Sequence, residues 1–306
     1  MPVTKLILNM SLPMMFSMFV QALYNIVDSV FVAQINENAL TAVSLAFPVQ
    51  GLMISVGVGT AVGVNALLSM RLGQKKQDEV NATAENGLFL AVCSFIVFFV
   101  IGLFCMRPYL ASQTDNREII EFGMEYLNVV VLGSFGMFSA IMLDRLLQGT
   151  GRTVFTMYSQ TAGALTNIIL DPLLIFGIGP FPRMGMTGAA LATVIGQWLS
   201  MCLSFLFNIK INKEIQFRFS RFRPDALVIV QIYKVGVPSI LLNSITSVTT
   251  YFLNLILGSF SSTAIAVYGV YFKLNSFIFM PVFGLNNGIV PIIAYNYGAE
   301  HKKRIV

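Results

Sequence analysis

The chain has 306 residues, of which 56% are hydrophobic and 11% are charged, against about 25% charged in an average soluble domain. A water-soluble protein is excluded, because too few polar side chains are available to cover its surface. The net charge of +5 does not indicate a nucleic-acid partner, since most Lys and Arg residues lie in short connections between apolar runs, as membrane topology predicts.

Eight apolar runs predict membrane-spanning helices, because each reaches the roughly 20 residues that a bilayer requires. They cover residues 11–34, 43–70, 86–106, 122–144, 157–178, 187–209, 235–258 and 265–297. The runs are continuous and too long for the strands of a transmembrane barrel. The predicted fold class is therefore an all-α polytopic membrane protein.

The basic residues predict the topology. Fifteen of the 19 Lys and Arg residues lie before the first run, after the last run or in the even-numbered connections. Such residues collect on the cytoplasmic side of a membrane. We expect a multi-pass protein with a cytoplasmic N-terminus.

The longest polar stretch, residues 210–233, separates six runs from the last two. It predicts a division into a six-helix lobe (1–209), a cytoplasmic linker (210–233) and a partial second lobe (234–306). The linker is either an ordinary basic loop or an amphipathic segment on the anionic inner leaflet. Its alternating aromatic and basic residues are Phe217, Arg218, Phe219, Arg221, Phe222 and Arg223.

An internal repeat appears when the sequence is aligned with itself at an offset of 225 residues. The identical pairs are Ile7 and Ile232, Pro13 and Pro238, Ala39 and Ala264, Phe47 and Phe272, Gly59 and Gly284, Gly63 and Gly288, and Gly73 and Gly298. The G-x-x-x-G pairs allow helices to approach closely. Two parallel six-helix units would occupy about 450 residues at this offset, so we expect the chain to be part of a twelve-helix protein.

Two carboxylates within the runs are candidate functional groups, because ionisable residues are costly in a membrane. Asp28 follows Tyr24 by four residues and Asp171 follows Asn167 by four, so each pair shares one helical face. Pro172 removes a backbone donor next to Asp171. The two acids either take up and release protons or coordinate Na⁺ together with Asn167. Alternatively, Asp28 is solvated at a helix end and Asp171 satisfies backbone at the proline.

Other polar residues within the runs have two interpretations each. Lys273, a candidate cavity-lining residue, either pairs with a carboxylate in the expected further helices of the second lobe or extends to the membrane interface. Four neutral ones either line a cavity or form one interhelical hydrogen bond each: Gln21, Gln50, Asn65 and Gln197. Asn25 is a further candidate for the cavity wall. Asp144 and Arg145 are explained mainly by helix capping and by the excess of basic residues on the cytoplasmic side.

One histidine and three cysteines within apolar runs exclude a two-histidine metal site and a histidine-based triad. An intramembrane enzyme would need a constellation such as H-E-x-x-H, which the sequence lacks. We therefore predict no enzymatic activity, no bound metal and no cofactor.

Four segments resemble the multidrug and toxic compound extrusion (MATE) family, specifically its DinF-like and MepA-like bacterial members. They are L-Y-N-I-V-D-S-V-F-V-A (23–33), L-L-Q-G-T-G-R-T (146–153), N-I-I-L-D-P-L-L-I-F-G-I-G (167–179) and M-T-G-A-A-L-A-T-V-I-G-Q (186–197). The resemblance covers the whole chain. It implies a MATE-type fold, here the six-helix N-terminal lobe plus the first two helices of a C-terminally truncated second lobe.

The resemblance also implies an antiporter of the bacterial cytoplasmic membrane. It would export cationic or amphipathic compounds, driven by inward flow of H⁺ or Na⁺, and would work as a monomer among membrane lipids. The family's N-lobe cation site carries over onto Asp28, Tyr24, Asn167, Asp171 and a helix-six threonine, Thr193 rather than Thr187. The seventh run contains no carboxylate, which favours the N-lobe site. The alternative is a lipid or lipid-linked oligosaccharide flippase of the related superfamily, which would need a more cationic cavity.

Overall fold

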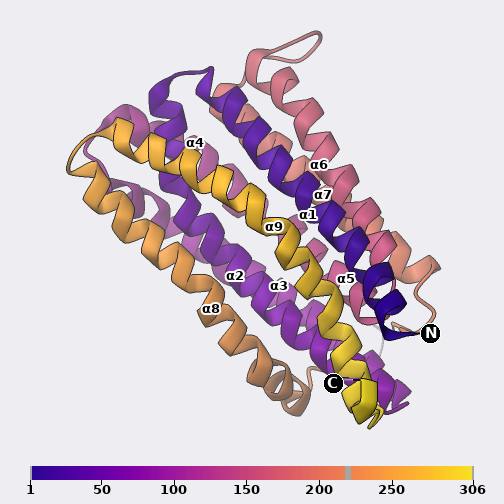
Figure 1. Ribbon diagram of the computed structural model, residues 1–306. Coiled ribbons are helices and arrows are strands. Elements are labelled where there is room, and N and C mark those ends of the chain that lie inside the picture. The colour runs from indigo at the N-terminus through magenta and orange to yellow at the C-terminus, as the bar shows by residue number, and fades with distance from the viewer. Residues whose placement is uncertain (1, 218–221, 305–306) are drawn as a thin grey trace.

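A computed structural model describes residues 2–217 and 222–304 of the chain (Figure 1). Within these ranges it contains helices and no strand, which confirms the all-α prediction. The elements are α1 (Val3–Ala33), α2 (Glu37–Gly73), α3 (Gln77–Ala111), α4 (Arg117–Leu132), α5 (Phe135–Gly149), α6 (Thr153–Phe176), α7 (Gly185–Lys210), α8 (Ala226–Gly258), α9 (Ser262–Gly298) and a 3₁₀ turn (Lys302–Arg304).

Each predicted apolar run coincides with one of these helices or with a helix pair. Two runs, 11–34 and 157–178, end one and two residues beyond their helices, and most of the others are extended by polar turns. Six helices in the described ranges are long and apolar enough to cross a membrane: α1, α2, α3, α7, α8 and α9. The run at 122–144 is divided between α4 and α5, which meet at a bend of 48°. If this pair is one span, the described ranges contain seven such spans.

Helix α6 is the remaining predicted span and does not meet the same criteria of length and hydropathy. Its 24 residues rise about 36 Å, which is enough for a hydrocarbon core of about 30 Å. Its polarity is the reason for the difference. The buried polar side chains of α6 are Thr153, Thr156, Ser159, Asn167 and Asp171, and they face protein rather than lipid.

The helices are arranged around α1 and α2. Helix α1 packs against α6 on one side and α9 on the other, while α2 contacts α3, α4, α5, α8 and α9. Both ends of the chain lie at the same end of the bundle (Figure 1). Helices α8 and α9, which belong to the predicted second lobe, pack on α1 and α2 more extensively than on each other.

The 225-residue repeat corresponds to a two-fold exchange of helix contacts. In each contact, a glycine of one repeat lies directly against a helix of the other repeat. The matching contact, at positions shifted by 225 residues, has the glycine in the other repeat. The pairs are Gly59 with Ile240 and Gly284 with Met15, Gly63 with Gly236 and Gly288 with Ser11, and Gly73 with Tyr295 and Gly298 with Met70. Reciprocity of this kind defines an approximate two-fold axis. Even the N-caps of α2 and α9 match, since Asn36 accepts from Ala39 N and Ser261 from Ala264 N.

The linker is shorter than the predicted 210–233, because the Asp225 side chain caps α8 at its start by accepting from Leu227 N. Its described part is tied to the N-terminal half of α3. Gln216 N donates to Asn81 Oδ1 (2.9 Å), and the Phe222 ring lies 5.8 Å from that of Phe89. Arg218, Phe219 and Arg221 of the proposed amphipathic segment lie outside the described residues.

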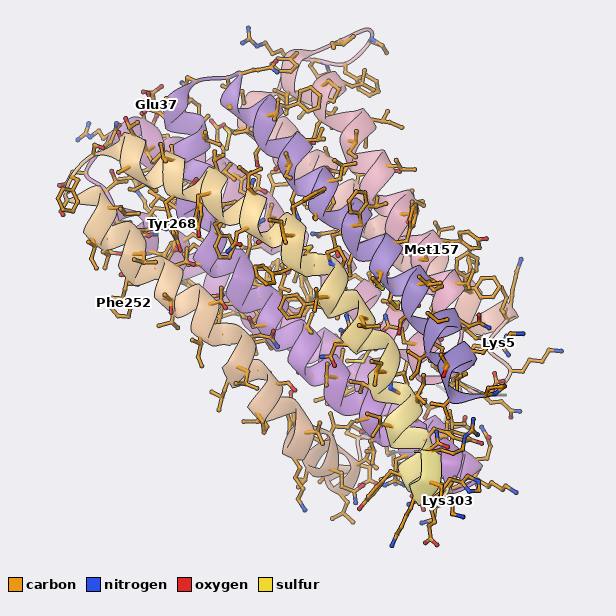
Figure 2. All side chains as sticks on the ribbon, viewed as in Figure 1. Lys5, Glu37, Met157, Phe252, Tyr268 and Lys303 are labelled. Atoms are coloured by element: carbon orange, nitrogen blue, oxygen red, sulfur yellow. The ribbon has the colours of Figure 1, made fainter. Side chains whose placement is uncertain are left out.

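The outer surface is apolar along the helices and charged at their ends. Figure 2 shows Phe252 of α8 pointing away from the bundle, and its side chain is 58% exposed. Lys5 and Lys303 lie at the end that holds both termini, and Glu37 at the opposite end. An apolar exterior of this kind is expected for a surface that faces lipid. The cytoplasmic orientation of the termini stays a prediction.

Candidate functional site

The packing of α1 against α6 brings the two intramembrane carboxylates into one buried region. Asp28 is 5% exposed and Asp171 is fully buried, and the two interact electrostatically. Among the described residues, Oδ1 of each has no hydrogen-bond partner. A buried acceptor without a donor is costly, so these two oxygens are available for a proton, a cation or water.

Asn167 and Thr193 hold Asp171 in place. In the amide orientation that satisfies both neighbours, Asn167 Nδ2 donates to Asp171 Oδ2 at 3.2 Å. Its oxygen accepts from Thr193 N at 3.0 Å and from Thr193 Oγ1 at 3.2 Å. The structure therefore places Thr193, the favoured of the two candidate threonines, in contact with the α6 pair.

A cavity of about 370 Å³ lies beside this network. Side chains of α1, α2, α4, α5, α7, α8 and α9 line it, including Tyr24 and Asp28. Asn167 and Asp171 do not line the cavity but lie behind Thr193, which does. Thus a path of polar contacts runs from the cavity through Thr193 to the buried carboxylate.

Most of the polar residues predicted to line a cavity do so. Asn25, Gln50, Gln197 and Lys273 all contribute to its wall. Gln21 and Asn65 are not among the lining residues: the α1 part of the wall begins at Ala22, and Asn65 Nδ2 donates to the Arg145 carbonyl at 3.4 Å, which is its other predicted role. Gln50 also has the other predicted role, since its Nε2 donates to Tyr126 Oη at 3.2 Å.

Lys273 is buried at 9% exposure and does not extend to the membrane interface. Its Nζ donates to Ser29 Oγ and lies 4.6 Å from the centre of the Phe47 ring. It interacts electrostatically with both Asp28 and Asp171. Nothing in the local sequence indicates this position, because α9 meets α1 only through the tertiary fold.

Sequence reasoning missed a second buried polar cluster at the other end of the bundle. Asp144 is 3% exposed and accepts hydrogen bonds from Ser159 Oγ (3.0 Å), Gln160 Nε2 (2.9 Å) and Ser204 Oγ. The expectation that Asp144 caps a helix is therefore wrong. Its side chain instead joins α5 to α6 and α7. The donors are more than a dozen residues away in the chain, so no short motif could have revealed them.

Arg145 links this cluster to the second repeat. It is 6% exposed, and its Nη1 donates to Gln148 Oε1 and to Asn287 Oδ1 of α9, both at 3.0 Å. The excess of basic residues on the cytoplasmic side does not explain a guanidinium buried between two repeats.

The described residues contain no cluster of three or more His, Cys, Asp or Glu side chains that could hold a metal ion. The site instead offers carboxylate, amide and hydroxyl oxygens from Asp28, Asp171, Asn167 and Thr193. Such hard oxygen donors suit an alkali cation or a proton rather than a transition metal.

A family model described as MatE matches residues 13–173 and 238–306. The chain is 26% identical over 294 residues to the multidrug export protein MepA of Staphylococcus haemolyticus, covering 96% of this chain and 64% of that protein. It is 28% identical over 306 residues to an FAD transporter of Shewanella oneidensis, covering 99% and 67%. The chain thus spans about two thirds of the length of these relatives.

The fold also matches a solved structure, the MATE multidrug transporter DinF-BH. The TM-score is 0.92 at 29% sequence identity, covering 98% of this chain and 67% of that one. An outward-facing MATE family transporter of the MOP superfamily matches with a TM-score of 0.89 at 25% identity, covering 100% and 67%. Both comparisons agree with the arrangement of α1 to α9 described above.

Proposed function

Because this chain belongs to the MatE family of membrane transporters, we propose that the protein exports cationic or amphipathic toxic compounds. Export would occur across a bacterial cytoplasmic membrane, coupled to inward flow of H⁺ or Na⁺, with the N-terminus on the cytoplasmic side. The observation that carries the proposal is the cavity whose wall includes Asp28 and whose polar contacts continue to Asp171. The protein would act as a monomer without a cofactor.

Competition between substrate and coupling ion gives the mechanism. A cationic substrate in the cavity is stabilised by the ionised carboxylates, since opposite charges attract strongly where water is excluded. A proton or Na⁺ on Asp28 and Asp171 removes that attraction and satisfies their unpartnered oxygens. Loading of the ion and binding of the substrate therefore oppose each other, which is the energetic requirement for antiport.

Helix α1 supplies the conformational element of the proposal. It carries Asp28 and lies between α6 and α9, one from each repeat. It also contains Pro13, and a proline removes one hydrogen bond from the helix interior. Neutralisation of the carboxylates would change the packing of α1 against α6 and so alter the cavity.

The test is ethidium efflux from proteoliposomes that contain the complete gene product, under separately imposed pH and Na⁺ gradients. Asp28→Asn and Asp171→Asn are compared with Asp115→Asn, an exposed carboxylate in the connection between α3 and α4. We expect gradient-driven efflux to be lost in the first two variants and kept in the control. Efflux that survives in Asp171→Asn with its ion dependence unchanged would refute the coupling mechanism.

A second candidate is transport of an anionic aromatic compound, because the Shewanella oneidensis relative is named an FAD transporter and FAD is an anion with aromatic rings. Lys273 favours it, because an ammonium group lines the cavity beside the aromatic rings of Phe47 and Phe272. Transport of FAD in the same proteoliposomes, with no transport of ethidium, would favour this candidate. A lipid flippase has less support, since the wall holds one lysine and one carboxylate rather than a cationic lining.

A further inference from the structure

We propose that Lys273 is a tethered counter-cation of the Asp28 and Asp171 site, which sets the charge of the cavity and makes it selective for monocations over dications. The inference rests on the proposed export of cationic compounds and names the charge class of the substrate. It assigns to the second repeat a direct part in the cation site of the first.

The contacts of Lys273 fix its ammonium group inside the site. Ser29 Oγ accepts a hydrogen bond from Lys273 Nζ and itself donates to the Asn25 carbonyl at 2.8 Å. The face of the Phe47 ring, 4.6 Å away, attracts the same ammonium by a cation–π interaction. These partners come from α1 and α2, so the lysine of α9 is held by the opposite repeat.

The charged groups around the ammonium determine the net charge of the site. Asp28 of α1 lines the same cavity as Lys273 and precedes Ser29, the residue that accepts from the ammonium. Asp171 of α6 lies behind Thr193 of that wall. The other polar side chains of the described cavity wall, from α1, α2, α4, α7, α8 and α9, are neutral, among them Gln50, Tyr126 and Gln197. Tyr24 of α1 and Ser276 of α9 are neutral as well. With both carboxylates ionised, the net charge is therefore −1 rather than −2.

Ion pairing does not cancel this charge locally. Ion pairs within 4 Å, in the ranges that the structure describes, join Arg71 to Glu79, Lys76 to Glu79 and Arg152 to Glu214. Lys273 thus acts on the two carboxylates through the field of the cavity, whose wall holds one group of each sign, Asp28 and Lys273.

The repeat shows that Lys273 is specific to one half. At the 225-residue offset, Lys273 corresponds to Pro48 and Asp28 corresponds to Leu253. The second repeat therefore has no acid at the position of Asp28, and the first has no lysine at the position of Lys273. A buried ammonium costs several kcal/mol unless opposite charges compensate it, which the two carboxylates do.

The charge balance determines which cations bind. A monocation brings the site from −1 to 0, whereas a dication leaves +1 in a region of low dielectric. The repulsion from Lys273 is also twice as large for the dication, because Coulomb energy is proportional to the ligand charge. Removal of the ammonium should thus improve the binding of dications more than that of monocations.

Ethidium and propidium are suitable probes, because they share one aromatic ring system and carry one and two positive charges. Their binding to the purified complete gene product is measured by fluorescence titration. In Lys273→Met we expect affinity to rise about tenfold for ethidium and about a hundredfold for propidium. Lys273→Arg keeps the charge and should keep the wild-type ratio. Lys234→Met, an exposed lysine of α8, is the matched control and should change neither affinity.

A double variant separates charge from packing. Asp28→Asn combined with Lys273→Met restores a net charge of −1, so the ratio of the two affinities should return toward the wild-type value. An unchanged ratio in Lys273→Met, or weaker binding of both dyes, would overturn the inference while leaving cation export in place. If no variant binds either dye, the proposed function fails and the inference with it.

Discussion

The isosteric change Thr193→Val tests the path between the cavity and Asp171. It removes only the hydroxyl that donates to Asn167 Oδ1 at 3.2 Å and keeps the shape of the side chain. The backbone N–H of residue 193 still donates to the same oxygen at 3.0 Å. The amide of Asn167 therefore keeps its orientation but is held less firmly.

The size of the effect follows from these bonds. One neutral hydrogen bond contributes about 1 kcal/mol net, which corresponds to about a fivefold change in an equilibrium constant. Asn167→Leu should have a larger effect, because it leaves Asp171 Oδ2 without its donor. Hydrogen bonds to charged groups contribute about 1.5–3 kcal/mol, or roughly tenfold to a hundredfold.

The assay is the dependence of ethidium efflux on the concentration of the coupling ion in proteoliposomes. We expect the half-saturating concentration to change about fivefold in Thr193→Val and more in Asn167→Leu, with the amount of folded protein unchanged. Thr193→Ser keeps the hydroxyl and serves as the control. If Thr193→Val behaves as wild type, or if the serine and valine variants are equally impaired, the hydroxyl does not position Asn167 and the reasoning is wrong.

Three further predictions concern stability, measured as the loss of monodisperse detergent-solubilised protein on heating. Gly63→Val and Gly288→Val should destabilise the protein by similar amounts, about 1–3 kcal/mol each. The reason is that each new Cβ meets the opposing helix at a matching position of the repeat. A large effect of one substitution alone would contradict the two-fold exchange of contacts. Asp144→Asn should lower the free energy of unfolding by about 1–3 kcal/mol, since an amide cannot accept all three of the buried hydrogen bonds. Unchanged stability would show that the Asp144 cluster does not stabilise the fold. Arg152→Ala should change stability by less than about 1 kcal/mol, because its partner Glu214 is 41% exposed; a larger loss would mean that the linker is held mainly by this pair.

Much of the site was predictable because its polar pairs are local in the chain. Residues four apart share a helical face, so the Asn167 and Asp171 pair needed only the helix period to be recognised. The structure adds a hydrogen bond between the two side chains. What remained open was whether Asp28 is solvated. Its burial depends on α6 and α9, which pack on α1 from distant parts of the sequence.

The helical membrane architecture and the repeat follow directly from the order of the residues. Apolar runs of this length have few folded alternatives in a bilayer, where every backbone polar group must be satisfied within the segment. The G-x-x-x-G pairs at matching positions likewise predict close helix contacts before any partner is known. Hydropathy described α6 least well, because a helix surrounded by protein needs no apolar exterior.

Which distant groups meet depends on how the helices pack in three dimensions. Lys273 contacts Ser29 across 244 residues, and Arg145 contacts Asn287 across 142. Their pairing is fixed by the two-fold packing of α1 and α2 against α8 and α9, which depends on the shapes of whole helix faces. A side chain's position along its own helix follows from local sequence, whereas the charge it faces across an interface follows from packing. The electrostatic balance of the cavity is therefore a property of the fold.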